Sequence, residues 1–517
     1  MNGAQALIRT LVDSGVDTCF MNPGTSEMHF VAALDDVPQM RGVLTLFEGV
    51  ATGAADGYAR MAGKPAATLL HLGPGLGNGL ANLHNARKAH TPVVNIVGDH
   101  ATYHKQYDAQ LESDIETVAK NVSAFIRWSQ KADEVGRDAA ETVAAAFGPP
   151  GQVATQVLAA DAAWSGGGVA HAPIAVPAGA VVDDATVDYV ASVLHSGEPT
   201  AILIGGRACL ADSLTTVAAI AAKTGAKLLC ETFPARLARG AGCPPVERIA
   251  YLAEFAAMQL DGLKHLVLID AKSPVSFFAY PDKASDLVPD GCHVHQLVGP
   301  ADQLSAIDAL ARVVGASAAD APRQAAARPE LPTGELNASA VCQTIGALLP
   351  ANAIVSDEGN TSGLFAAGFT AGAPAHDWLT LTGGAIGQGL PVAVGAAIAC
   401  PDRKVIALEA DGSAMYTLQS LWTMAREQLD IVTVVFNNHS YAVLNMELDR
   451  VGATAGGAKA KAMLDLHHPE IDFVSLAQGM GVRATCATTA EEFNEQFAAA
   501  VAQSGPTLID ARVPSIL

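Results

Sequence analysis

The chain has 517 residues, of which half are hydrophobic and 5% aromatic, and its formal net charge is −21. A length of roughly 150 residues per domain predicts three domains rather than one core. The acidic balance argues against a nucleic-acid-binding or anionic-membrane-binding surface, because both favour clusters of Lys and Arg. The eight cysteines are scattered singly, which predicts neither a zinc site nor a disulfide framework and fits a reducing compartment.

The sequence also lacks targeting signals. No window reaches 18 uninterrupted apolar residues, and no basic patch leads into an apolar segment at the amino end. We therefore expect a cytoplasmic protein without a signal peptide or membrane span.

Short apolar runs alternate along the chain with stretches of helical length. In chain order, the runs predicted as strands cover residues 43–47, 67–72, 93–97, 201–204, 227–229, 266–269, 353–355, 405–408, 431–436 and 507–509. Strand, helix and strand repeated in this way predict parallel sheets with helices on both faces. The predicted fold class is α/β, with doubly wound parallel sheets.

Two stretches interrupt this alternation. Residues 159–183 are rich in Ala, Gly and Val and poor in charge, and residues 316–334 have the composition of a linker. They predict three domains, at 1–165, 180–318 and 334–517.

Polar residues follow two neighbouring apolar runs of the third domain. Asp411, Gly412 and Ser413 come after the run 405–408, and an Asn-Asn pair ending at Asn438 closes the run 431–436. The interval between them has room for a turn, one helix and a second strand beside the first. A carboxylate and an amide oxygen at the carboxyl ends of two parallel strands suit a hard divalent cation that keeps positions free for phosphate.

This spacing resembles the thiamine diphosphate motif, in which Gly-Asp-Gly-Ser is followed at a fixed interval by Asn-Asn. Ala410 stands where that motif usually has Gly, and the segments 22–24, 48–60, 73–78 and 383–391 also come in family order. The chain is identified on these motifs as a member of the thiamine diphosphate-dependent family that holds acetolactate synthase, benzoylformate decarboxylase and benzaldehyde lyase. The resemblance implies a pyrimidine-binding, a central and a diphosphate-binding domain, in that order.

The resemblance also implies a set of cofactor ligands. Mg²⁺ would be held by the side chains of Asp411 and Asn438 and by the backbone carbonyl of Ser440. Thiamine diphosphate would be contacted by Pro23, Asn78, Gly359, Asn360, Thr361, Gly384, Ile386, Gly412 and Ser413. Residues 359–361 precede a predicted helix start, whose backbone N–H groups would bind phosphate oxygens. FAD is not expected, because the segment 180–318 contains no flavin-binding pattern.

Glu48 follows the run 43–47 and resembles the glutamate that activates the cofactor by sharing a proton with the aminopyrimidine. Without the resemblance, a lone Glu after a strand is most often a solvated helix N-terminus. His71 lies at the end of the run 67–72, where benzoylformate decarboxylase has a proton-handling histidine and acetolactate synthases generally have none. Ser26 falls close to where benzoylformate decarboxylase has a substrate-binding serine. The alternative interpretations of these two candidate catalytic residues are a core histidine for His71 and a turn cap for Ser26.

The implied reaction starts with attack of the cofactor ylid on a small 2-oxo acid, which then loses CO₂ to leave an enamine. Protonation would make the protein a decarboxylase, and attack on an aldehyde or ketone acceptor would make it a carboligase. An acetolactate synthase large subunit is the alternative, although His71 does not fit it. An inactive cofactor-binding regulatory paralogue is a third reading, which Glu48 does not fit. The family further implies a homodimer or homotetramer.

Overall fold

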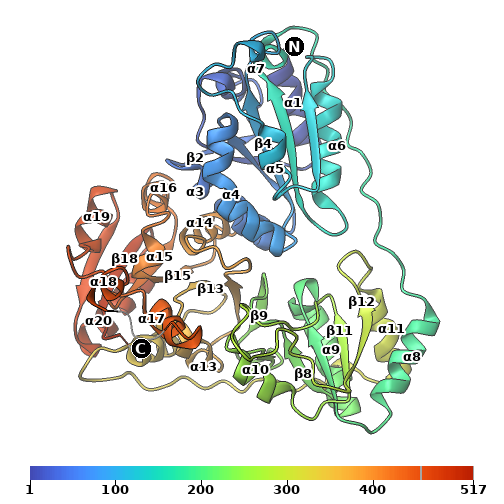
Figure 1. Ribbon diagram of the computed structural model, residues 1–517, viewed down its shortest axis with the longest axis vertical. Helices are drawn as coiled ribbons and strands as arrows, with labels where there is room; N and C mark the ends of the chain where they lie inside the picture. The colour runs from blue at the N-terminus through green and yellow to red at the C-terminus, as the bar shows by residue number, and fades with distance from the viewer. Residues whose placement is uncertain (454–456, 516–517) are drawn as a thin grey trace.

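The computed structural model describes residues 1–453 and 457–515, and within them the strands form three sheets with helices on both faces (Figure 1). This is the α/β fold that the alternating runs predict. All ten predicted runs overlap strands. None of the helices in the described part of the chain combines the length and the apolar character that a membrane span needs.

The first sheet is wholly parallel and carries the amino-terminal third of the chain. Its strands in spatial order are β2 (Arg41–Leu44), β1 (Thr18–Met21), β3 (Ala66–Leu70), β4 (Val93–Asp99), β6 (Val153–Ala159) and β5 (Phe125–Ser129). Its helices are α1 (Gly3–Asp13), α2 (Met28–Ala33), α3 (Glu48–Ala62), α4 (Leu72–Lys88), α5 (Ile115–Ala119), α6 (Val135–Phe147) and α7 (Ala160–Trp164).

The second sheet is also parallel. Its strands in spatial order are β10 (Glu247–Arg248), β8 (Lys227–Cys230), β7 (Thr200–Ile204), β11 (His265–Ile269) and β12 (His293–Val298). Its helices are α8 (Asp184–Leu194), α9 (Ala211–Thr224), α10 (Ala253–Leu260) and α11 (Ser305–Val314). A long extended segment joins α7 to α8 and runs down one side of the molecule (Figure 1).

The third sheet holds the carboxyl-terminal third. Its strands in spatial order are β17 (Arg483–Ala487), β18 (Thr507–Arg512), β16 (Ile431–Asn437), β15 (Val405–Ala410), β13 (Ile354–Glu358), β14 (His376–Thr380) and β9 (Leu237–Arg239). Its helices are α12 (Ala338–Leu348), α13 (Ala366–Phe369), α14 (Gly389–Ala399), α15 (Asp411–Ala414), α16 (Ser420–Arg426), α17 (Ala442–Arg450), α18 (Ala458–Ala462), α19 (Phe473–Gly479) and α20 (Ala490–Ala502).

The strand β9 departs from the expectation of purely parallel sheets. It comes from the middle of the chain, between β8 and β10, and pairs antiparallel with β14. The pairing occupies the backbone groups that an edge strand would otherwise leave free. One consequence is that the middle segment is tied directly to the third sheet.

Two predicted strands end earlier than their apolar runs. The run 43–47 continues past β2, which ends at Leu44, and the run 67–72 continues past β3, which ends at Leu70. After β3, His71 is followed by α4 at Leu72, whereas after β2 residues 45–47 form a bend before α3 starts at Glu48. Apolarity alone does not separate a strand from the first buried turn of a helix.

The helices α3 and α14 cross at very short range and join the first and third sheets. A Cβ on Gly57 would lie 2.2 Å from the Val392 carbonyl oxygen, and one on Gly395 would lie 1.9 Å from the Ala54 carbonyl oxygen. Glycine at both positions lets the two backbones touch. Every residue of α3 from Glu48 to Met61 is buried, so this crossing forms part of the core.

Candidate functional site

The predicted metal and phosphate residues lie at the carboxyl ends of three adjacent strands. β13, β15 and β16 lie side by side in the third sheet and run parallel. Asp411 begins α15 directly after β15, and Asn438 follows the last residue of β16. This edge of a parallel sheet is where open α/β folds bind their ligands.

Asp411 has the surroundings of a metal ligand. It is 2% exposed, and its Oδ1 accepts a hydrogen bond from the Gly412 N–H at 2.7 Å. Its Oδ2 is buried and has no hydrogen-bond partner in the part of the chain that the structure describes. Burial raises the pKa of Asp411 to about 6, although backbone N–H groups of Gly412, His439 and Ser440 oppose that shift. A buried carboxylate oxygen left without a donor is a group that a divalent cation would satisfy.

Asn438 and Ser440 complete the predicted ligand set. Asn438 is 7% exposed, its Oδ1 accepts from the Ser440 N–H at 3.0 Å, and its Nδ2 donates to the Ser362 hydroxyl at 3.3 Å. Within the described residues, no three His, Cys, Asp or Glu side chains are grouped to hold a metal. A cation here would depend on one carboxylate with amide and carbonyl oxygens, a ligand set that suits Mg²⁺.

The predicted phosphate residues lie on the same edge. The Asn360 Nδ2 donates to the Ser413 hydroxyl at 2.8 Å, which ties the segment after β13 to the start of α15. A Cβ on Gly412 would lie 2.3 Å from the Tyr441 ring, so only glycine fits that position. Gly359 and Thr361 flank Asn360, which has a φ of +46°. The helix start expected after Thr361 is a 3-10 turn, Ser362–Phe365, which continues directly into the short helix α13.

Glu48 lies at the first position of α3 and is 6% exposed. The Asn78 Nδ2 donates to its Oε2 at 2.9 Å. A Cβ on Gly75 would lie 3.2 Å from Glu48 Oε1 and 3.4 Å from the His71 Cβ, so Glu48 and His71 flank the same glycine. The structure therefore brings Glu48, His71 and Asn78 together.

His71 belongs to a polar cluster that the sequence only partly reveals. Its Nδ1 lies 2.8 Å from the Glu27 Oε2 and 3.3 Å from the Ser26 hydroxyl. The Ser26 hydroxyl also donates to Glu27, which in turn accepts the Gly24 N–H at 2.7 Å. Glu27 is 3% exposed. Pro23 immediately precedes this cluster in the chain.

The sequence interpretation missed Glu27. It follows Ser26 directly, in a short 3-10 turn that reads as an ordinary helix start. An acidic residue three positions after a Gly at such a start was the available signal, but nothing in the sequence says that a residue 44 positions later supplies its partner. A buried carboxylate beside an imidazole fixes the ring tautomer, because it accepts the Nδ1 proton and leaves Nε2 as the exchanging nitrogen.

The segment 383–388 is held from several sides. His84 Nε2 lies 3.2 Å from the Gly383 carbonyl oxygen, and the Asn85 side chain bonds both the N–H and the carbonyl of Ala385. Gly384, with a φ of +73°, packs so closely on the middle segment that a Cβ there would lie 2.5 Å from Phe277.

Ile386 is half-buried. Its neighbour Gly387 is linked through a side chain of the first sheet's helices to the residue that follows Glu48. The Asn82 Nδ2 donates to the Gly387 carbonyl at 3.2 Å and to the Gly49 carbonyl at 2.8 Å. Gly49 follows Glu48. Among the described residues, no direct hydrogen bond joins Glu48, Asn78 or His71 to Asp411, Asn438 or Ser440.

Family models match both ends of this arrangement. Residues 1–120 match the model described as thiamine pyrophosphate enzyme, N-terminal TPP binding domain, and residues 357–511 match the C-terminal TPP binding domain of the same enzymes. The chain belongs to the thiamine pyrophosphate enzyme family. Both matched segments are cofactor-binding domains, so this thiamine pyrophosphate enzyme uses thiamine diphosphate, as the sequence motifs predict.

This thiamine pyrophosphate enzyme aligns with known relatives over nearly its whole length. It is 61% identical over 518 residues to the "Putative acetolactate synthase large subunit IlvX" of Mycobacterium tuberculosis (strain ATCC 25618 / H37Rv), with all of both chains covered. It is 29% identical over 541 residues to the benzoylformate decarboxylase of Pseudomonas aeruginosa (strain PAO1), with 97% of each chain covered. Both resemblances read from the motifs are confirmed.

A solved structure supports the fold. The thiamine diphosphate-dependent 4-hydroxybenzoylformate decarboxylase of Rhodococcus jostii RHA1 superposes with a TM-score of 0.85 over 99% of both chains, at 24% identity. The predicted class, α/β with doubly wound sheets, is therefore confirmed by a related architecture. As a member of this family, the protein is an enzyme that acts on a small-molecule substrate.

Proposed function

We propose that this protein is a thiamine diphosphate- and Mg²⁺-dependent 2-oxo acid decarboxylase or carboligase. When bound, thiamine diphosphate supplies the electron sink that lets a 2-oxo acid lose CO₂. The surrounding residues would bind the cofactor, exclude water and move protons. The same three segments, 1–165, 180–318 and 334–517, would act as the pyrimidine-binding, central and diphosphate-binding domains.

The observation that carries the proposal is the position of His71 beside Glu48. The two side chains flank Gly75, and the carboxylate of Glu27 holds the His71 ring at 2.8 Å. An oriented imidazole next to the activating glutamate is suited to give a proton to the reacting carbon or take one from it. Ser26, which contacts the same ring nitrogen, would help to bind the substrate carboxylate.

At the other end of the site, Asp411, Asn438 and Ser440 would hold Mg²⁺. Support for this comes from the buried Asp411 Oδ2, which has no donor. Asn360, Thr361, Gly359 and the first turn of α15 would hold the diphosphate, since their N–H and hydroxyl groups line the same sheet edge.

An acetolactate synthase large subunit is the second candidate. Its support is the name of the Mycobacterium tuberculosis relative, which is 61% identical over the whole chain. The His71 cluster favours the first proposal, because proton transfer to the product carbon is a decarboxylase step. The buried, hydrogen-bonded Glu48 speaks against an inactive regulatory paralogue.

We further infer that the active form is a homodimer or homotetramer. Large apolar side chains adjacent in sequence to the candidate site residues are exposed: Leu46, Leu364, Phe365, Met415 and Tyr416. A second copy would cover such a patch and bring its own Glu48 group to the site. Sedimentation of a fully active monomer would refute this inference.

All eight cysteines are free, which supports a cytoplasmic location.

Product analysis tests the main proposal. The protein is incubated with thiamine diphosphate, Mg²⁺ and, separately, pyruvate, benzoylformate and branched 2-oxo acids, and the products are identified by NMR. An aldehyde, or a 2-hydroxyketone other than acetolactate, from any of these acids supports the proposal, and acetolactate from pyruvate as the sole product favours the second candidate. Binding of the cofactor without turnover of any of the acids contradicts both.

A further inference from the structure

Two glutamates lie side by side beneath the first turn of α14. Glu358 and Glu409 are register partners on β13 and β15, and they are 2% and 0% exposed. A Cβ on Gly389 would lie 2.0 Å from the Glu409 Oε1 and 2.9 Å from the Glu358 Cβ. Both side chains therefore press directly against the start of the helix that follows the segment 383–388.

The two carboxyl groups have different partners. Glu358 accepts the Gly387 N–H with Oε1 at 2.6 Å and the Gly389 N–H with Oε2 at 2.5 Å. Neither oxygen of Glu409 has a hydrogen-bond partner among the described residues, although both are buried. Burial raises the pKa of both groups. The backbone N–H donors oppose that rise at Glu358, whereas Glu409 has no such donor among the described residues.

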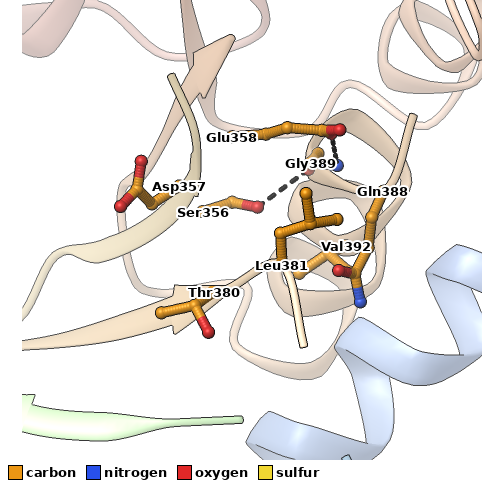
Figure 2. Close-up of a pocket in the computed structure, with 8 residues that line it drawn as sticks. All are labelled: Ser356, Asp357, Glu358, Thr380, Leu381, Gln388, Gly389 and Val392. Atoms are coloured by element: carbon orange, nitrogen blue, oxygen red, sulfur yellow. Dashed lines mark hydrogen bonds between the residues drawn. The ribbon is translucent and has the colours of Figure 1, made fainter. Parts of the chain in front are cut away.

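Figure 2 shows the surroundings of Glu358. Its carboxylate points to Gly389, and the Ser356 hydroxyl donates to the Gly389 carbonyl at 2.8 Å from the same strand. The gap between these residues, Leu381 and Val392 has no room for a water molecule. Water therefore cannot replace the carboxylate as acceptor for the two N–H groups.

The segment in front of α14 depends on such contacts for its shape. Gly384 and Gly387 have φ values of +73° and +89°, and the segment forms neither helix nor strand. Without a regular hydrogen-bond ladder, its conformation is set by the side chains that bond its backbone. Glu358 binds the N–H of Gly387 in this segment and the N–H of Gly389, the first residue of α14, with one carboxyl group.

We propose that Glu358 is a positioning residue that fixes the segment 383–388, so that Gly384 and Ile386 lie where bound thiamine diphosphate meets them. The proposal rests on the proposed function, because the cofactor is the group that this segment would contact. It adds a role for a residue that does not itself touch cofactor or substrate.

Amide hydrogen exchange of the full-length protein without cofactor gives the first test. Glu358→Gln keeps the shape but offers one acceptor to two donors, so the Gly387 and Gly389 amides should exchange about 10-fold faster or more. Glu409→Gln is the matched control, since it changes a neighbouring buried carboxyl that accepts no backbone N–H among the described residues to a side chain of the same size. Exchange in the control should stay at the rate of the unmodified protein.

Cofactor binding gives the second test. Calorimetry with thiamine diphosphate and Mg²⁺ should give an affinity about 10-fold weaker for Glu358→Gln and unchanged for Glu409→Gln. If Glu358→Gln does not fold, Glu358→Met fills the same volume without a buried charge and should show both effects more strongly.

Faster amide exchange with unchanged affinity would overturn the positioning role, and so would equal effects in the two Gln variants. If the unmodified protein binds no thiamine diphosphate, the proposed function fails. The amide exchange would still report whether Glu358 fixes the segment.

Discussion

The Nδ1 of His71 lies 2.8 Å from a carboxylate oxygen of Glu27, across a span of 44 residues in the chain. This pair joins the last residue of the turn after β1 to the residue that follows β3, and these two strands are neighbours in the first sheet. The contact orients the His71 ring.

Glu27→Gln should lower kcat about 10-fold or more while leaving thiamine diphosphate affinity unchanged, because the ring loses the acceptor that orients it but no cofactor contact is removed. Steady-state kinetics with the best substrate, together with calorimetry, measure both quantities. Glu141→Gln, which breaks an exposed ion pair with Arg127, is the control and should change neither. A kcat equal to that of the unmodified protein would mean that His71 needs no orientation or no proton passes through it.

Glu48→Gln should keep cofactor binding and slow proton exchange at the cofactor C2 by about 10²–10⁴-fold, the range typical of a lost acid or base. The amide retains the shape and a hydrogen bond but cannot carry the proton. Quenched hydrogen–deuterium exchange read by NMR measures this step without knowledge of the substrate. An unchanged exchange rate would leave Glu48 a purely structural residue.

Asp411→Ala should abolish Mg²⁺-dependent retention of thiamine diphosphate, because the diphosphate would lose the cation that bridges it to the protein. Calorimetric titration of cofactor and Mg²⁺ is the measurement. Asp472→Ala removes an exposed helix cap at the start of α19 and serves as the control that leaves retention intact. Equal affinity in Asp411→Ala and the unmodified protein would remove Asp411 from the metal site.

His376 should make the protein acid-sensitive. It is 4% exposed, and burial lowers its pKa from 6.5 to about 4. The unfolded chain therefore binds a proton between pH 6.5 and 4 that the folded protein excludes, so stability is full above pH 6.5 and falls as the pH drops toward 4. The loss is at most about 3 kcal/mol.

His376→Asn tests this, since its amide can still donate to the Pro374 carbonyl that His376 Nδ1 contacts at 2.8 Å. Denaturant unfolding at pH 7.5 and pH 4.5 should show a smaller acid loss in the variant than in the unmodified protein. Identical losses would assign the acid sensitivity to other groups.

Gly57→Ala should destabilise the protein by about 1–3 kcal/mol or more, because its Cβ would lie 2.2 Å from a backbone oxygen of α14. Gly479→Ala is a matched control at the last position of α19, where no atom lies within 4 Å. Thermal unfolding of both variants checks the difference. A neutral Gly57→Ala would show that the two helices can separate without cost.

The sequence predicts which polar residues meet at the edge of the third sheet, and the reason is geometric. Asp411 and Asn438 each follow an apolar run, and parallel strands joined by one helix bring their carboxyl ends to one edge. The interval between two motifs therefore carries spatial information. Glu48 and His71 also follow apolar runs, in the first sheet, but only the family resemblance singled them out as candidate catalytic residues.

The pattern of apolar runs does not reveal residues whose partners lie far along the chain. Asn82 and Asn85 contact the segment 383–388 about 300 positions away, and nothing in their own helix distinguishes them from surface asparagines. Glu409 lies in the otherwise apolar strand β15, and a single charged residue in such a strand is normally predicted to face solvent. Its burial depends on α14, whose place above the sheet is set by tertiary packing.

The close crossing of α3 and α14 also has a consequence for how the protein is made. The surface of α3 is covered by a helix that leaves the ribosome long after the amino-terminal sheet is complete. Until residue 399 has emerged, a helix that is buried from Glu48 to Met61 in the finished protein keeps an apolar, glycine-rich face open to solvent. During synthesis this face is open to aggregation and to chaperone binding, and final closure of the molecule waits for its carboxyl-terminal third.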